Sequence, residues 1–267
     1  MHFSLGISPC PNDTYLFDAW VNRKIDSGDI ELSLHLEDVQ TLNEWALEEK
    51  LDITKISFGV YPLIQNNYIL LDSGSAMGIG VGPLLITTPK KAEHFSLADF
   101  SALRIAIPGE NTTAHFLFNK AFPEARNKQF MVFHEIEAAV LNGEVDAGVI
   151  IHENRFTYQD KGLVCKMDLG KFWEETTGLP IPLGGIVIHK RIADQQEKIN
   201  RLLYDSLVYA RKHDPMLPYF VTKNAQEMSE TVMRRHIDLY VNDYSLSMGT
   251  TGRMAIAAMT NEYTASP

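Results

Sequence analysis

Short strand-like runs alternate with helix-like segments along most of this chain, and this alternation limits its possible folds more than any other feature. Residues 3–7, 31–36 and 53–56 are apolar or alternating runs that are typical of strands. The apolar face of the helix expected before the third strand is marked by Leu42, Trp45, Ala46 and Leu47. Strands that alternate with helices predict an α/β fold.

Polar turns follow these strands. Residues 9–13 are expected to form a turn after the first strand, and Asn12 or Asp13 is the expected N-cap of a helix that runs through Val21. Ser57 follows the third strand and is expected to cap the segment after it. In open α/β sheets, ligands bind beyond the carboxyl ends of the strands, so these turns are candidate binding positions.

Two helix-to-strand junctions resemble each other. At Leu47–Ile53 and at Leu141–Ala147, a leucine is followed five residues later by an aspartate and then by an apolar strand. The alternative interpretation is chance, because such junctions share a composition. Together with the alternation of strands and helices, the match predicts two similar lobes.

The lobe boundaries follow from the strand pattern. Residues 83–88 are expected to form a strand that leaves the first lobe, and residues 182–188 a strand that returns to it. We therefore expect 1–88 in the first lobe, 89–184 in the second, and 185–267 as a return segment with largely helical structure. A chain that crosses twice between lobes predicts a cleft, a common location for ligands.

The composition narrows the possible partners. The 267 residues carry a formal net charge of −10, which argues against a nucleic-acid or anionic-membrane surface. A local site can still bind a small anion. No apolar stretch is long enough to span a bilayer, residues 1–5 do not resemble a signal peptide, and Cys10 and Cys165 form no CxxC pair. We therefore expect a cytoplasmic protein.

The sequence lacks several common cofactor and metal motifs. Residues 78–82 are rich in glycine but do not form GxGxxG, and a strand rather than a helix is expected after them. His152-Glu153 begins like HExxH, but Phe156 stands where the second zinc ligand would be. We therefore expect no dinucleotide site and no metal.

His152 is the strongest candidate for proton transfer. The apolar run 147–151 is expected to be a buried strand, and it stops at His152, before Glu153 and Arg155. A histidine at the end of such a strand can accept or donate a proton near neutral pH. The alternative is a surface or hydrogen-bonded loop histidine.

Three strand-to-helix turns, at Asn12, Ser57 and Thr113, offer hydrogen-bond donors to a carboxylate. Free N–H groups at a helix start bind anions, aided by the helix dipole. Lys55 could add a positive charge. The alternatives are ordinary N-capping by Thr112 or Thr113 and a solvated lysine.

Five motifs together resemble one family. The motifs are Ser8–Thr14, Lys55–Tyr61, Pro108-Gly109 with Thr112–Ala114, Ile151–Glu153 with Arg155–Tyr158, and Gly178–Gly184. With these motifs, the chain resembles the 1,4-dihydroxy-6-naphthoate synthases of the futalosine route to menaquinone. The resemblance spreads over most of residues 1–190.

The resemblance implies a two-lobed fold like that of type II periplasmic binding proteins, with mixed sheets flanked by helices. It implies a lyase that cleaves cyclic dehypoxanthinylfutalosine to 1,4-dihydroxy-6-naphthoate and dihydroxyacetone without a metal or organic cofactor. His152 would be the general base, and the substrate, a small-molecule carboxylate, would be bound by Lys55, Ile56, Ser57, Thr113 and Ala114. No obligate protein partner is implied. Two alternatives stay open: chorismate dehydratase of the same pathway, and a non-enzymatic solute-binding protein.

Overall fold

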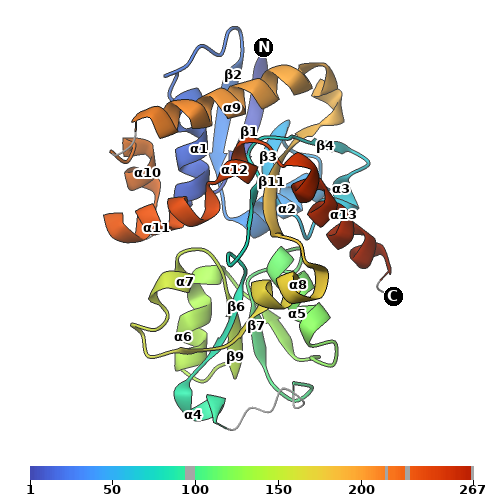
Figure 1. Ribbon diagram of the computed structural model, residues 1–267, viewed down its shortest axis with the longest axis vertical. Coiled ribbons are helices and arrows are strands. Elements are labelled where there is room, and N and C mark those ends of the chain that lie inside the picture. The colour runs from blue at the N-terminus through green and yellow to red at the C-terminus, as the bar shows by residue number, and fades with distance from the viewer. Residues whose placement is uncertain (94–99, 214–215, 226–228, 266–267) are drawn as a thin grey trace. The chain divides into compact units, whose positions relative to one another are not determined.

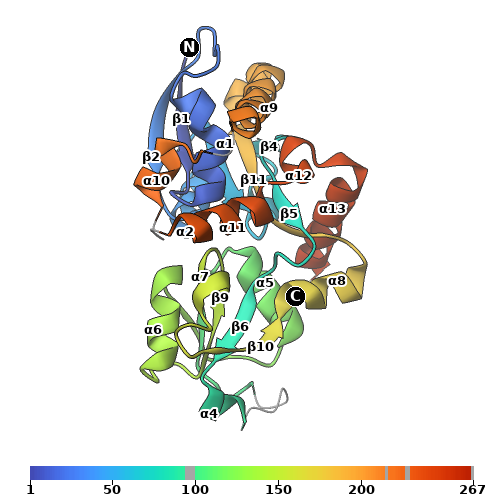
Figure 2. The ribbon, with the colours of Figure 1, turned by 60° about the vertical axis from the view of Figure 1, so that its left-hand side comes forward.

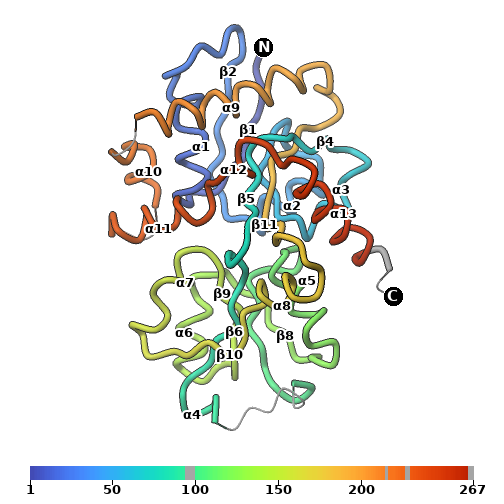
Figure 3. The backbone as a smooth tube through the Cα atoms, in the orientation of Figure 1, coloured from blue at the N-terminus to red at the C-terminus, as the bar shows by residue number. Residues whose placement is uncertain are grey.

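The computed structural model describes residues 1–93, 100–213, 216–225 and 229–265 (Figure 1). The chain forms two compact units. The first unit joins Met1–Gly78 to Pro182–Pro267, and the second is Ile79–Ile181 (Figure 3). The expected boundaries, after residues 88 and 184, lie later in the chain. The first boundary differs because the strand Leu84–Thr87 pairs within the sheet of the second unit.

The first unit contains a mixed sheet in the order β2-β1-β3-β11-β4, and β5 pairs with β11. β1 is parallel to β2 and β3, whereas β11 is antiparallel to β3 and β4. The elements of the first unit are β1 (His2–Ile7), α1 (Pro11–Val21), β2 (Glu31–Leu36), α2 (Val39–Leu47), β3 (Ile53–Ser57), α3 (Tyr61–Ile64), β4 (Tyr68–Leu70), β5 (Ala76–Gly78), β11 (Ile181–His189), η2 (Lys190–Gln195), α9 (Gln196–His213), α10 (Tyr219–Asn224), α11 (Glu230–Tyr240), α12 (Asp243–Leu246) and α13 (Gly249–Ala265).

The second unit contains a mixed sheet in the order β10-β6-β9-β7-β8. In Figure 2, α6 lies on one side of β6 and β9, and α8 lies on the other. The elements of the second unit are β6 (Leu84–Thr87), α4 (Pro89–Ala92), β7 (Ile105–Ile107), α5 (Thr113–Ala121), β8 (Lys128–Phe130), η1 (Phe133–Glu135), α6 (Ile136–Leu141), β9 (Ala147–Ile150), α7 (Asn154–Thr157), β10 (Val164–Asp168) and α8 (Leu169–Thr177). The predicted α/β class with mixed sheets and flanking helices is confirmed.

The inner strands of the first sheet, β3 and β11, are buried almost throughout, whereas the edge strand β2 is partly exposed and alternates polar and apolar residues. Successive residues of a strand point to opposite faces. Accordingly, Ile186 and Ile188 join the core cluster beneath α1 and α9, whereas Val187 joins the cluster near α2 and α3. α1 and α9 pack side by side (Figure 1). Among the described residues, no helix is long and apolar enough to cross a membrane.

The two sheets share one topology, as the repeated junction predicted. Strands β2, β1, β3, β11 and β4 of the first sheet correspond, in that order, to strands β8, β7, β9, β6 and β10 of the second sheet. The repeated aspartates occupy equivalent positions. Asp52 precedes β3 and accepts the backbone N–H of Ser4 at 2.8 Å, and Asp146 precedes β9 and accepts that of Arg104 at 2.9 Å. Asp52 therefore ties the start of β3 to β1, and Asp146 ties the start of β9 to the start of β7.

The start of α1 differs from the prediction. Pro11 is the first helical residue and Cys10 is the N-cap, with no side-chain capping bond. Proline is favoured at the first helical position because its fixed φ suits a helix and its missing N–H is not needed there. Asn12 and Asp13 therefore lie inside the first turn, and neither caps the helix.

Asp146 contributes stability that depends on pH. Burial opposes ionisation of this carboxyl, but hydrogen bonds from Arg104 and Lys91 outweigh burial and hold its pKa well below the usual range. A lowered folded-state pKa gives stability that is present above the unfolded pKa, about 3.9, and is lost as the pH falls below it. We expect Asp146→Asn to lower the free energy of unfolding at pH 7 by about 1.5–3 kcal/mol.

Urea unfolding followed by circular dichroism measures this effect. The difference between the wild type and the variant should shrink as the pH falls below about 4. A difference that is equal at pH 7 and pH 3 would show that the ionised carboxylate is not responsible.

Candidate functional site

Three of the predicted site residues, Lys55, Ile56 and Ser57, form the carboxyl end of β3 in the first unit. Their side chains alternate between the two faces of the sheet. Ile56 has no exposed surface and packs in the core with Ala46 and Val187. Any contact of Ile56 with a ligand therefore comes from its backbone, whereas Lys55 and Ser57 offer polar side chains.

Lys55 forms a buried ion pair with Asp13, which lies in the first turn of α1. The Nζ atom of Lys55 lies 2.7 Å from Oδ1 of Asp13, and the two side chains are 8% and 4% exposed. Gly184 on the neighbouring strand β11 makes room for this lysine, because a Cβ there would lie 2.9 Å from Cε of Lys55. Lys55 is thus held inside the unit, contrary to the alternative of a solvated lysine.

The turn after β1 surrounds Asp13 with donors. The hydroxyl of Ser8 donates to Oδ2 at 2.7 Å, and the amide of Asn12 donates to Oδ1 at 2.7 Å. The Ser8–Thr14 motif therefore fixes a carboxylate that in turn fixes Lys55, in place of the capping role that we expected. The side-chain amide of Asn12 thus belongs to the same network around Asp13.

Ser57 is fixed at the last position of β3. Its backbone N–H donates to Oδ1 of the buried Asn43 at 2.9 Å, and its hydroxyl lies 3.3 Å from the carbonyl oxygen of Leu183. The hydroxyl of Ser57 also accepts the N–H of Gly59 at 3.4 Å, so Ser57 caps the turn that follows β3, whereas α3 itself begins later, at Tyr61 after Val60. The hydroxyl and the lysine therefore flank the same strand end within the first unit.

Thr113 and Ala114 are the first two residues of α5 in the second unit, and both are buried. Thr112 is the N-cap, and its hydroxyl accepts the N–H of His115 at 3.2 Å. Of the two capping alternatives, the structure thus selects Thr112. The N–H groups of Thr113 and Ala114 lie in the first turn, where the helix dipole favours an anion.

His115, which the sequence analysis did not select, also lies in this first turn. Burial lowers the pKa of its imidazole below the usual value, against a hydrogen bond with the carbonyl oxygen of Glu110 that raises it. The lowered pKa favours the neutral imidazole, and the nearby charge of Lys128 acts in the same direction.

His152 follows β9, and its backbone has a positive φ of 56°. Positive φ is uncommon for residues other than glycine and often marks functional turns. The ring is partly buried and contacts Phe133, with the ring centres 4.9 Å apart. Because β7 and β9 are adjacent and parallel, the turns that lead to Thr113 and His152 leave the same edge of this sheet.

Arg155 lies three residues after His152, and its guanidinium binds protein groups. It donates to the carbonyl oxygens of Gly80 and Gly82 and to the carboxylate of Asp168 at 3.1 Å. These contacts tie α7 to the start of the second unit. They assign Arg155 a structural role and make it a poor candidate for the proton acceptor.

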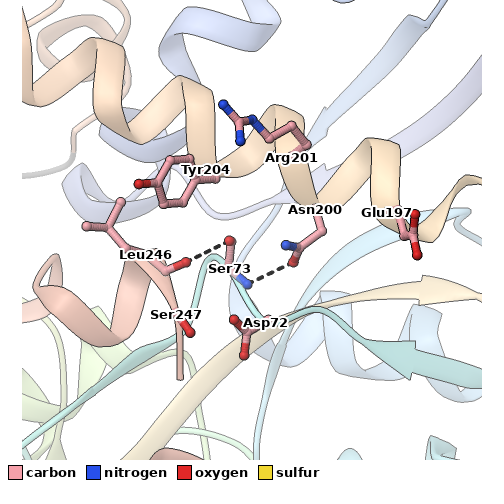
Figure 4. A pocket seen from close by; sticks show the side chains of 8 residues that line it. All are labelled: Asp72, Ser73, Glu197, Asn200, Arg201, Tyr204, Leu246 and Ser247. Carbon is pink, nitrogen blue, oxygen red and sulfur yellow. Dashed lines mark hydrogen bonds between the residues drawn. The ribbon is translucent and has the colours of Figure 1, made fainter. Parts of the chain in front are cut away.

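A separate surface pocket of about 360 Å³ lies in the first unit (Figure 4). Ser73 is one of the residues that line it. Its N–H donates to the side-chain oxygen of Asn200, and its hydroxyl donates to the carbonyl oxygen of Leu246. None of the predicted site residues lines this pocket. In the described part of the chain, no group of three His, Cys, Asp or Glu side chains could hold a metal ion.

A profile of the family described as menaquinone biosynthesis matches residues 3–265. The chain belongs to this family. It is 40% identical over 256 residues to the 1,4-dihydroxy-6-naphthoate synthase of Thermus thermophilus, covering 96% of this chain and 91% of the relative. It is 38% identical over 268 residues to the synthase of the same name from Streptomyces coelicolor, covering 96% and 90%. The resemblance predicted from the five motifs is confirmed.

Solved structures agree on the fold. A crystal structure from Archaeoglobus fulgidus superimposes with a TM-score of 0.90 at 31% identity, covering 99% of this chain and 97% of that one. The periplasmic aliphatic sulphonate binding protein of Escherichia coli gives a TM-score of 0.67 at 12% identity, covering 99% and 87%. The family therefore has a fold like that of periplasmic binding proteins.

Proposed function

We propose that this chain is a 1,4-dihydroxy-6-naphthoate synthase that cleaves cyclic dehypoxanthinylfutalosine to 1,4-dihydroxy-6-naphthoate and dihydroxyacetone. The observation that carries the proposal is the similarity, over 96% of the chain, to two relatives with that enzyme name. The proposal invokes a small-molecule carboxylate as the only partner, and no metal, organic cofactor or obligate protein partner.

His152 is the proposed general base. It removes a proton from a sugar hydroxyl, and a retro-aldol-type cleavage then breaks a carbon–carbon bond and releases the three-carbon fragment. Aromatisation of the new ring provides the driving force. The electron pair of the broken bond stays in the products and His152 returns its proton to them, so the cleavage is redox-neutral and needs no oxidant. The position of His152 after a strand, with its ring against Phe133, supports this role because a base requires a fixed orientation.

Lys55, Ile56 and Ser57 in the first unit, and Thr113 and Ala114 in the second, are the proposed substrate-binding residues, with Ile56 and Ala114 contributing backbone contacts. The first turn of a helix favours an anion. Asp13 already balances the charge of Lys55, so the ammonium group would contribute to the ligand through its remaining N–H donors. These residues are held by protein contacts in each unit, which lowers the entropic cost of binding.

We expect Ser57→Ala and Thr113→Val each to weaken substrate binding more than they harm folding. Each change removes a hydrogen bond to a charged group, worth about 1.5–3 kcal/mol, or roughly tenfold or more in affinity. Calorimetric titration with the naphthoate product measures the affinity, with the exposed Thr251→Val as a control. Wild-type affinity in both variants would remove Ser57 and Thr113 from the proposed site.

Separate incubations with cyclic dehypoxanthinylfutalosine and with chorismate test the reaction, with the ultraviolet absorbance of the naphthoate followed in the first and the consumption of chorismate in the second. The proposal predicts naphthoate absorbance from the first substrate and no turnover of the second. Turnover of chorismate would instead indicate the dehydratase of the same pathway. Binding without turnover of either compound would indicate a solute-binding protein.

A further inference from the structure

The segment Phe133–Leu141, which comprises η1 and α6, contacts the turn of His152 at two places. Phe133 packs against the ring of His152, with 62° between the ring planes. Glu137, four residues later, accepts a hydrogen bond at its Oε2 from the side-chain amide of Asn154 at 2.6 Å. Asn154 lies two residues after His152 and is the first residue of α7. One short segment thus supports both the ring of His152 and the chain that follows it.

The backbone of His152 needs such support. A non-glycine residue at a φ of 56° is strained, and such a conformation persists only where surrounding contacts fix it. Two contacts hold the residues that follow His152. Arg155 binds the carbonyl oxygens of Gly80 and Gly82, and Glu137 binds Asn154. Without either contact, the turn can relax toward an ordinary φ, and the imidazole would then change direction.

Glu137 is an unusual residue to bury at this position. Its side chain is 3% exposed, and its charge is balanced by Lys161, whose Nζ atom lies 2.6 Å from Oε2. A buried carboxylate is costly to desolvate, and it often contributes less to stability than an apolar side chain of similar size. A charge-assisted hydrogen bond is, however, shorter and more directional than a neutral one. These properties suit a residue whose task is to fix the turn.

We propose that Glu137 is a positioning residue for the reaction, which orients His152 through Asn154. This inference rests on the proposed role of His152 as the general base. Glu137 is not proposed to touch the substrate. Its effect on turnover is expected to arise only from the direction of the imidazole, and misplacing a base by about 1 Å can lower a rate by roughly 100-fold.

Steady-state kinetics of Asn154→Ala and Glu137→Gln test this role. Each variant should lower kcat by about tenfold or more and change KM by less than about threefold, because orientation of the base matters in the transition state more than in substrate binding. Asn154→Ala leaves the Glu137–Lys161 ion pair intact, so the test survives if Glu137→Gln fails to fold. The exposed Glu135→Gln on the same segment serves as the matched control.

The same changes in a His152→Asn background separate positioning from a general loss of structure. If Glu137 acts through His152, Asn154→Ala should cause no further loss of the residual rate of His152→Asn. A further tenfold loss in that background, or wild-type kcat in both single variants, would overturn the positioning role.

Nuclear magnetic resonance of the imidazole gives a readout that does not depend on activity. The ring protons of His152 lie near the face or edge of Phe133, so their chemical shifts should change in Asn154→Ala and stay unchanged in Glu135→Gln. Unchanged shifts in Asn154→Ala would overturn the proposal. If His152→Asn retains the wild-type kcat, His152 is not the general base. The chemical shifts in Asn154→Ala separately decide whether Asn154 orients the ring.

Discussion

Replacing His152 with asparagine is expected to lower kcat by about 10²–10⁴-fold while the fold and much of the substrate affinity are retained. Asparagine is smaller, polar and unable to accept the proton at neutral pH. It also tolerates positive φ better than most residues, so it should keep the backbone of this turn, where φ is 56°. The loss should therefore come from the missing base and not from a rearranged loop.

Steady-state kinetics give kcat, and calorimetric titration with the naphthoate product gives the affinity. The exposed His213→Asn, in the other unit, is the matched control and should retain wild-type turnover. A folded His152→Asn protein with nearly wild-type kcat would disprove the assignment of the base. Equal losses in kcat and in product affinity would instead indicate that His152 mainly binds the ligand.

The second large effect is expected at the buried pair of Lys55 and Asp13. Lys55→Met leaves a carboxylate without its cation in a site where the aspartate side chain is 4% exposed. Breaking a buried ion pair on one side typically costs about 3–5 kcal/mol of folding free energy. Asp13→Asn should have a similar effect, because it leaves the buried ammonium group of Lys55 without a negative charge to balance it. The double variant should recover much of the loss, since neither charge then remains unpaired.

Urea unfolding of the two single variants and the double variant measures this coupling. Glu175→Gln, which breaks the exposed pair of Glu175 and Lys171, is the control and should change stability little. If the two single losses simply add in the double variant, the two charges are not coupled, and the account of Lys55 is wrong.

Most of the longer strands were predictable from sequence because they are buried apolar or alternating runs, whereas β4, β5, β8 and β10 were not predicted. The segment 31–36 agrees in both bounds with β2, and the segment 147–151 with β9 to within one residue. The internal repeat was also visible, because Asp52 and Asp146 stand at equivalent junctions. Local pattern was sufficient for these features, since the periodicity of a strand is a property of adjacent residues.

The partners of site residues were not predictable in the same way. Asp13 was interpreted as a helix cap, although its carboxylate pairs with a lysine 42 residues away. Asn43, which fixes Ser57, and Glu137, which holds Asn154, gave no local signal. The first boundary was expected after residue 88, which would leave β6 in the first lobe. Instead, β6 belongs to the second unit because it pairs with β9 and β10. Such pairings depend on topology, which local composition does not contain.

The proposed reaction is tested most directly by product analysis of the purified protein with cyclic dehypoxanthinylfutalosine. Chromatography with mass spectrometry quantifies the remaining substrate and both products over time. The account predicts one mole of 1,4-dihydroxy-6-naphthoate and one mole of dihydroxyacetone per mole of substrate consumed, without added metal or organic cofactor. Substrate recovered intact from a folded, ligand-binding protein, or a product that retains the three-carbon fragment, would contradict it.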